Sequence, residues 1–179
     1  MFPGPWSWGN KGAVRMADAV ACALAKKYNL PENFPLAVSG GSMGGLVSLM
    51  FAADTTHKLS GVAAACPCVD VPKSLDCHPD FPRTYVSAVA SYNMPLDEAI
   101  RAISPIRRIN DFPKVPFFIC SDAADDLFAE EDCDIFVSKL KQTGYDIEYY
   151  QQPGKLHGDF FPEIREKFHV FLEECILKG

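Results

Sequence analysis

The sequence predicts an α/β protein built on a mainly parallel sheet. Two observations carry this prediction. Short apolar segments bounded by Gly or Pro alternate with longer segments of helical periodicity, and this alternation runs from the first helix to the last. The 179 residues are enough for one hydrophobic core, and they contain no internal repeat or low-complexity tract. We therefore expect residues 1–179 to form a single domain with helices on both faces of the sheet.

The individual elements follow from hydrophobic periodicity and from their stop signals. Helices are expected where apolar residues recur every three to four positions, and strands where short apolar runs stand between turn residues. Gly144 ends one predicted helix and Pro162 opens another. In chain order the predicted elements are a helix over 12–28, a strand over 36–39, a helix over 46–54, a strand over 59–69, a strand over 115–120, a helix over 130–143, a strand over 145–151 and a helix from 162 onward.

Residues 70–110 differ from this alternating pattern. They contain five prolines and mixed polarity, and only 96–103 has the spacing of a short helix. We expect this segment to leave the sheet, to return to it, and to act as a cap that sets specificity.

Composition and charge exclude several functional classes. The chain is 48% hydrophobic and 22% charged, with a net charge of −6, so nucleic acid and anionic membrane surfaces are not expected partners. No apolar run approaches the length of a membrane span. The first twelve residues lack the charged start and apolar core of a signal peptide, and a cytoplasmic location is expected.

Seven cysteines, an odd number, are spread through predicted core elements, which is typical of free thiols in a reducing compartment. The pairs "CPC" at 66–68 and "CH" at 77–78 do not have the usual spacing of zinc ligands. We expect no metal and no cofactor.

The stretch "LAVSGGSMGG" contains the pattern G-x-S-x-G around Ser42, between a predicted strand and a predicted helix. A sharp turn in this context exposes the serine hydroxyl above the sheet and directs helix amides toward the same point. Gly40 and Gly44 are expected to make room for that turn. The competing interpretation is a flexible turn that contains a serine; phosphate-binding loops are excluded because their glycine patterns do not fit.

A nucleophilic serine needs an imidazole base, and His157 is the best of the four histidines. It lies in a Pro/Gly loop directly after the last predicted strand, where the carboxyl edge of the sheet gathers functional groups. The other three are predicted to be a solvated residue (His57), a residue of the insertion (His78) and a helix-surface residue (His169).

The acid that orients the histidine is expected after the third strand, in "FFICSDAADDLF". Three carboxylates are available there. Asp125 is the first choice, Asp126 the second and Asp122 the third.

The ordered set of an elbow, "ISPI", an acid turn and the histidine loop "PGKLHGDF" resembles the α/β-hydrolases. Within these it is similar to the esterase, dienelactone-hydrolase and prolyl-oligopeptidase-like group. The resemblance covers most of residues 12–178 and implies a three-layer αβα fold. The family's acid pattern fits best with Asp125, and its oxyanion hole uses the amide after the nucleophile, here that of Met43.

The chain departs from the family pattern at its start. The N-terminal strands of an α/β-hydrolase, and the loop that gives the second oxyanion amide, have no counterpart here. The chain is therefore expected to be a truncated form of the fold: a fragment, a minimal form, or an enzyme completed by another chain. The elbow strand would be an exposed edge, which we expect a homodimer or residues 1–10 to cover.

Trp6 and Trp8 have two interpretations, as apolar anchors of the N-terminus or as residues of the acyl pocket that lend an amide to the oxyanion. Tyr85, Tyr92 and Met94 of the insertion are further candidates for the pocket lining, although core packing explains them equally well.

The sequence thus predicts a serine hydrolase that cleaves a small ester, or else a peptide or amide, through Ser42, His157 and Asp125. The alternative is a truncated, catalytically degenerate module that binds a small molecule or a protein partner.

Overall fold

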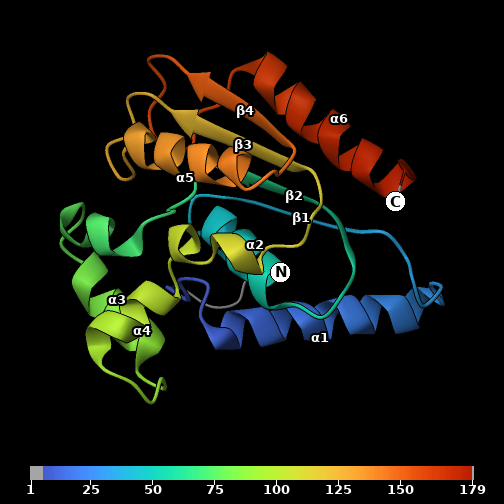
Figure 1. Cartoon of the computed structure of the whole chain (residues 1–179), viewed down its shortest axis with the longest axis horizontal. Coiled ribbons are helices and arrows are strands. Elements are labelled where there is room, and N and C mark those ends of the chain that lie inside the picture. The colour runs from blue at the N-terminus through green and yellow to red at the C-terminus, as the bar shows by residue number, and fades with distance from the viewer. Residues whose placement is uncertain (1–5, 179) are drawn as a thin grey trace.

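The computed structural model describes residues 6–178 and confirms the α/β class (Figure 1). Four strands form one sheet in the order β1-β2-β3-β4, and every neighbouring pair is parallel. The helices and strands are α1 (Lys11–Tyr28), β1 (Leu36–Gly41), α2 (Met43–Asp54), β2 (Leu59–Ala65), α3 (Phe81–Val89), α4 (Leu96–Ala102), β3 (Phe117–Asp122), α5 (Glu130–Gln142), β4 (Ile147–Gln152) and α6 (Pro162–Lys178).

Helices cover the sheet on both faces and make three layers. Alternate residues of β2 and β3 point to opposite sides, because side chains in a strand have a period of two. Val62 and Phe117 join the larger core cluster with α2 and α5, whereas Ala63 and Phe118 join a smaller cluster under α6. α1 packs against α2, on the face of the sheet that carries the larger core cluster.

Close packing of α6 depends on one glycine of β2. A Cβ atom built at Gly61 would overlap the thiol of Cys175 and touch Phe171, both on α6. The missing side chain therefore lets this helix lie directly on the sheet.

The segment between β2 and β3 is more regular than the sequence predicts. The short helix expected over 96–103 is present as α4, but α3 and a 3₁₀ turn over Val71–Asp76 precede it. Both additional elements carry proline in their first turn, where its missing N–H costs no hydrogen bond. These prolines start helical elements here, whereas the sequence pattern predicted irregular chain outside 96–103. Figure 1 shows α3 and α4 together, away from the sheet.

The elbow strand lies at the edge of the sheet, as expected. β1 pairs with β2 alone, and no strand within residues 6–178 pairs with its outer side. Residues 6–10 do not cover this edge: the Trp8 ring packs on Phe81 and Tyr85 of α3, and Gly9 lies against Met50 of α2. Residues 1–5 lie outside the described part of the chain.

The seven cysteines are unpaired, and Cys22 and Cys77 are exposed while the other five are buried. None of the helices in residues 6–178 combines the length and the apolar character that crossing a membrane requires.

Candidate active site

The turn between β1 and α2 holds Ser42 in a backbone conformation that side chains rarely adopt. Its φ is 56° and its ψ is −127°, in a region that costs a residue with a Cβ of order 1–3 kcal/mol. The strain is held in place from both sides, because the Ser42 amide donates to the Ala65 carbonyl (2.8 Å) and the Leu46 amide donates to the Ser42 carbonyl (3.1 Å). Ser42 is therefore fixed at the carboxyl end of the sheet and is not part of a flexible loop.

Two glycines make this turn possible, and one of them is not the predicted one. A Cβ atom at Gly40 would overlap the carbonyl group of Gly44 and approach the Gly45 nitrogen to 2.9 Å. At Gly44 itself a Cβ would meet nothing within 4 Å, so the expectation that Gly44 makes room is wrong. Gly45 is the second position with little room for a side chain, since a Cβ atom there would lie 3.1 Å from Pro67.

His157 reaches Ser42 from the loop after β4. The distance from His157 Nε2 to Ser42 Oγ is 2.7 Å, and the distance from His157 Nδ1 to Asp125 Oδ2 is also 2.7 Å. With the proton on Nδ1, the imidazole donates to the carboxylate and its Nε2 accepts from the serine hydroxyl. In this arrangement a serine proton can pass to an imidazole held in one tautomer.

Asp125 is fixed by backbone amides of its own turn. Its Oδ1 accepts from the amides of Leu127 (2.8 Å) and Phe128 (2.9 Å), and its side chain is 1% exposed. The carboxylate therefore keeps one oxygen for His157. This contact raises the pKa of His157 above its ordinary value; burial of the ring opposes the shift, while the charges of Asp125, Asp122 and Asp126 add to it.

The other two candidate acids have different places. Asp126 is exposed, and neither its side chain nor that of Asp122 is hydrogen-bonded to the His157 ring. Asp122 is buried, and its carboxylate accepts from the side chain of Gln152 (2.6 Å) and from the amide of Gly158 (2.9 Å). Burial raises the pKa of Asp122 above its ordinary value.

Gln152 was not anticipated from the sequence. It is fully buried at the end of β4, and its Oε1 accepts from the Phe161 amide (2.9 Å) while its Nε2 also lies 3.3 Å from the Asp159 carbonyl. Asp122 and Gln152 thus form a buried hydrogen-bonded pair that holds the backbone directly after His157, and we call this pair the brace of the histidine loop. A glutamine at the end of the last strand, directly before the histidine loop, was the only available signal.

The Met43 amide is the first of α2, and the amides of a first helical turn have no acceptor within their helix. Together with the positive end of the helix dipole they can stabilise an anion that forms beside Ser42.

Trp8 and Tyr85 lie in the core. Trp8 is 1% exposed and donates from Nε1 to the hydroxyl of Thr84 (3.0 Å), as an anchor would. Trp6 is 42% exposed and lies 6.5 Å from the Phe81 ring. Tyr85 is fully buried, with its hydroxyl 2.6 Å from the Ser74 hydroxyl.

Tyr92 and Met94 lie away from the triad. The Tyr92 hydroxyl accepts from the Lys11 amide at the start of α1, and Met94 is exposed before α4. Their role in a substrate pocket remains a prediction, without a contact to Ser42 or His157.

The remaining histidines take up other surroundings. His169 is exposed on α6, His78 packs on Phe81, and His57 is partly buried beside Asp18. Within the described residues, no three His, Cys, Asp or Glu side chains are grouped so that they could hold a metal ion.

Fold and site together define the class of the protein. A parallel sheet with a strand–serine–helix turn, an acid turn and a histidine loop at one edge is the α/β-hydrolase fold. The model of the prolyl oligopeptidase family matches residues 6–175, and the chain belongs to this family. The resemblance drawn from the sequence is thereby confirmed.

Solved structures agree with this assignment. A serine-to-alanine mutant of puromycin hydrolase, complexed with PGG, is 25% identical with a TM-score of 0.73, over 94% of this chain and 25% of that one. A puromycin-hydrolyzing peptidase of Mycobacterium tuberculosis is 20% identical (TM-score 0.72, covering 95% and 25%). An acylaminoacyl peptidase of Pyrococcus horikoshii is 16% identical (TM-score 0.68, covering 89% and 27%). A search of curated proteins found no match.

The chain spans about a quarter of the length of these solved structures. The similarity is therefore to one part of each of these proteins.

Proposed function

We propose that this chain carries the catalytic centre of a serine hydrolase that cleaves peptide or amide bonds. The observation that carries the proposal is the unbroken hydrogen-bonded series from Ser42 through His157 to Asp125. Membership of the prolyl oligopeptidase family, together with relatives whose names are those of peptidases and a puromycin hydrolase, supports an amide or peptide substrate. Small esters, the substrate class expected from the sequence, are chemically easier and would also be cleaved.

In the proposed mechanism, Ser42 Oγ attacks the carbonyl carbon and its proton passes to His157 Nε2. Asp125 holds the imidazolium that forms, and the Met43 amide donates to the tetrahedral oxyanion. When the C–N bond breaks, His157 returns the proton to the leaving amine. Water then attacks the acyl-enzyme with His157 again as base, and Ser42 recovers its proton when the acid product leaves. No cofactor takes part in these steps.

Labelling with a fluorophosphonate probe tests the proposal directly. The assembled triad should react with the probe at Ser42, and the wild-type chain should turn over a small chromogenic ester. Ser42→Ala should lose both signals, with turnover falling by roughly 10⁶-fold to background. Activity that survives in Ser42→Ala would show that the nucleophile is a different residue.

A second candidate is a non-catalytic binding module of the same fold. Two observations favour it: the Met43 amide is the only oxyanion donor that we assign within residues 6–178, and the adjacent edge of β1 is unpaired among those residues. Probe labelling separates the two candidates, because a degenerate triad would leave Ser42 unlabelled.

The unpaired edge of β1 also supports the proposal that a second copy of the chain covers it. A groove of about 450 Å³ beside this edge is lined mainly by apolar residues of α1, β1 and α2, including Val20, Leu24 and Val38. Light scattering should then give the mass of a dimer; a monomer with that edge bare would contradict the proposal.

The segment over 70–110 is proposed to act as the cap, since Phe81 of α3 stacks on Phe128 beside the histidine (6.0 Å between ring centroids). A cytoplasmic location is proposed only from the unpaired thiols.

A further inference from the structure

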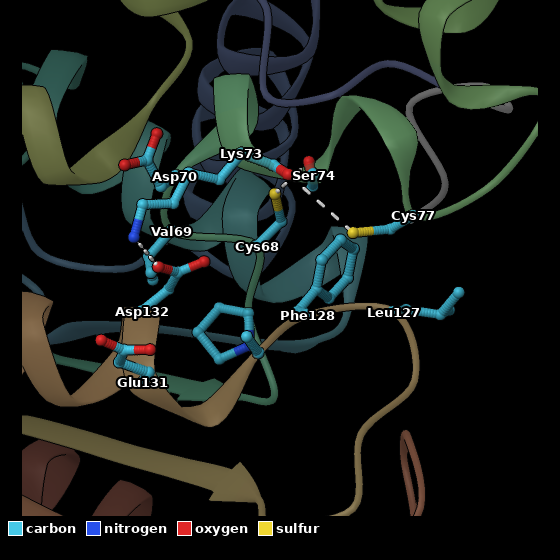
Figure 2. Close-up of a pocket in the computed structure, with 12 residues that line it drawn as sticks. Cys68, Val69, Asp70, Lys73, Ser74, Cys77, Leu127, Phe128, Glu131 and Asp132 are labelled. Carbon is cyan, nitrogen blue, oxygen red and sulfur yellow. Dashed lines mark hydrogen bonds and ion pairs between the residues drawn. The ribbon is translucent and has the colours of Figure 1, made fainter.

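A pocket of about 340 Å³ lies beside Leu127 and Phe128, in the turn that follows Asp125 (Figure 2). Phe128 belongs to both sites: its ring lies edge-on to the His157 ring at 5.2 Å, and it lines the pocket together with Leu127. One side chain, that of Phe128, therefore contacts both the pocket and the candidate catalytic histidine.

The two sides of the pocket differ in chemistry. Figure 2 shows Asp70, Lys73, Glu131 and Asp132 on one side, and Cys68, Ser74, Cys77, Leu127 and Phe128 on the other. The side next to the triad is therefore apolar and weakly polar, and the remote side is charged.

The weakly polar side leaves little hydrogen-bonding capacity for a ligand. The Ser74 hydroxyl donates to the Val71 carbonyl (2.9 Å) and lies 2.6 Å from the Tyr85 hydroxyl. The Cys68 thiol lies 3.4 Å from the same Ser74 hydroxyl. These groups are satisfied by one another, so a polar ligand group would find its partners at the charged side.

On the charged side, three carboxylates face one ammonium. Lys73 forms an ion pair with Asp132, and the first turn of α5 offsets part of the charge of Glu131 and Asp132, by roughly half a unit charge. Asp70 is not on that helix. The balance of these charges is negative.

Asp70 is the group without a partner. It is 7% exposed, it lines the pocket, and its Oδ1 is buried with no hydrogen bond from any described residue. A buried carboxylate oxygen without a donor is costly, because the solvation it loses is not replaced. The pKa values of neighbouring groups agree with a negative field: that of Lys73 is raised by the hydrogen bond to Asp132 and by the charges of Asp132, Asp70 and Glu131.

We propose that this pocket is a cation subsite, in which Asp70 is the counter-ion of a protonated amine or guanidinium carried by the substrate. An ammonium or guanidinium supplies the donors that Asp70 lacks, and the apolar part of the pocket accommodates the carbon chain that joins it to the reacting carbonyl. The inference rests on the proposed function, since it takes the ligand to be part of the substrate.

Binding to the Ser42→Ala chain tests the subsite without requiring turnover. Three amides are titrated by calorimetry: N-acetyl-arginine amide, with a cationic side chain; norleucine amide, with a free α-ammonium; and N-acetyl-norleucine amide, with neither. At least one cationic amide should bind about tenfold or more tightly than the neutral one. Which of the two binds identifies whether the cation is the side chain or the α-amine.

Variants then assign the effect to Asp70. Asp70→Asn in the same background should reduce the preference to near one, without loss of folding because it removes a buried charge. Lys73→Met should increase the preference, because it removes the competing cation. Glu173→Gln, an equal change of charge at an exposed position of α6, is the control and should leave the preference unchanged.

Equal affinity for all three amides would overturn the subsite, and so would a preference that survives in Asp70→Asn. Either result is distinguishable from failure of the proposed function, which is read from fluorophosphonate labelling of the wild-type Ser42.

Discussion

The serine turn and the histidine loop bring their residues to the same point by different means. The serine turn is held by steric fit: Gly40 has no room for a side chain, and Ser42 takes a positive φ. The histidine loop is held by buried polar contacts, in which Asp122 and Gln152 bond to each other and to backbone groups that follow His157.

This difference predicts how each region fails. A sterically fixed turn should be disrupted by one added methyl group, and it should tolerate changes of charge. A loop held by hydrogen bonds should tolerate small changes of volume, but it should lose its geometry when an acceptor becomes a donor. Single substitutions in each region test this contrast.

Among the variants that test this contrast, the largest effect is expected at Asp125, whose carboxylate contacts the histidine loop through His157. Asp125→Asn keeps the shape but presents an amide to His157 and to the two backbone amides that Asp125 accepts. The imidazole would no longer be held with its proton on Nδ1, and kcat should therefore fall by about 10⁴-fold. Steady-state kinetics on a small ester measures this. Asp126→Asn is the matched control, and an equal loss in that variant would move the acid role to Asp126.

Gly40→Ala tests the steric half of the contrast. The added Cβ would overlap the Gly44 carbonyl group, so the turn must shift and Ser42 must move from His157. We expect kcat to fall by roughly 100-fold, because small misplacements at a reacting centre have effects of this size. Overpacking should also lower the free energy of unfolding by about 1–3 kcal/mol.

Gly44→Ala is the neighbouring control, because a Cβ there meets nothing within 4 Å and alanine is favoured in a helix. It should keep wild-type kinetics and melting temperature. Equal damage in both variants would show that the turn needs flexibility and not space.

Asp122→Asn tests the polar half. Two donors, from Gln152 and Gly158, meet the carboxylate, and an asparagine can accept at only one of those positions. The loop should lose its geometry, with kcat lowered about tenfold, KM little changed and the melting temperature reduced. A normal kcat together with a lowered melting temperature would limit the brace to a role in stability.

The smallest effect is expected in the pH profile. Because His157 must be neutral to accept the serine proton, kcat/KM should rise with pH through a pKa that lies above the ordinary value for histidine. Asp126→Asn removes one of the negative charges that raise this pKa, so the midpoint should move to lower pH. A midpoint that is unchanged or moves upward would contradict the electrostatic account.

The sequence predicted the four strands and the main helices because their signals are local. Apolar periodicity over α1, α5 and α6 and the short runs of β2 and β3 need no knowledge of distant residues. α3 was missed because Pro82 reads locally as a break, although proline is favoured in the first turn of a helix.

The residues of the candidate site also fall into two groups, those with a local signal in the sequence and those that depend on the fold. Ser42 was evident in the sequence because glycine spacing is itself the structural requirement, and His157 because it follows the last strand. Which of Asp125, Asp126 and Asp122 lies within hydrogen-bonding distance of His157 depends on the fold, since three carboxylates in five residues differ only in where the turn directs them. Two further features also depend on the fold: the Oδ1 atom of Asp70 without a hydrogen bond from the described residues, and the contacts of Gln152 with the histidine loop. These hydrogen bonds depend on the distance and direction between residues far apart in the chain, and the spacing of residue types along the sequence predicts neither quantity.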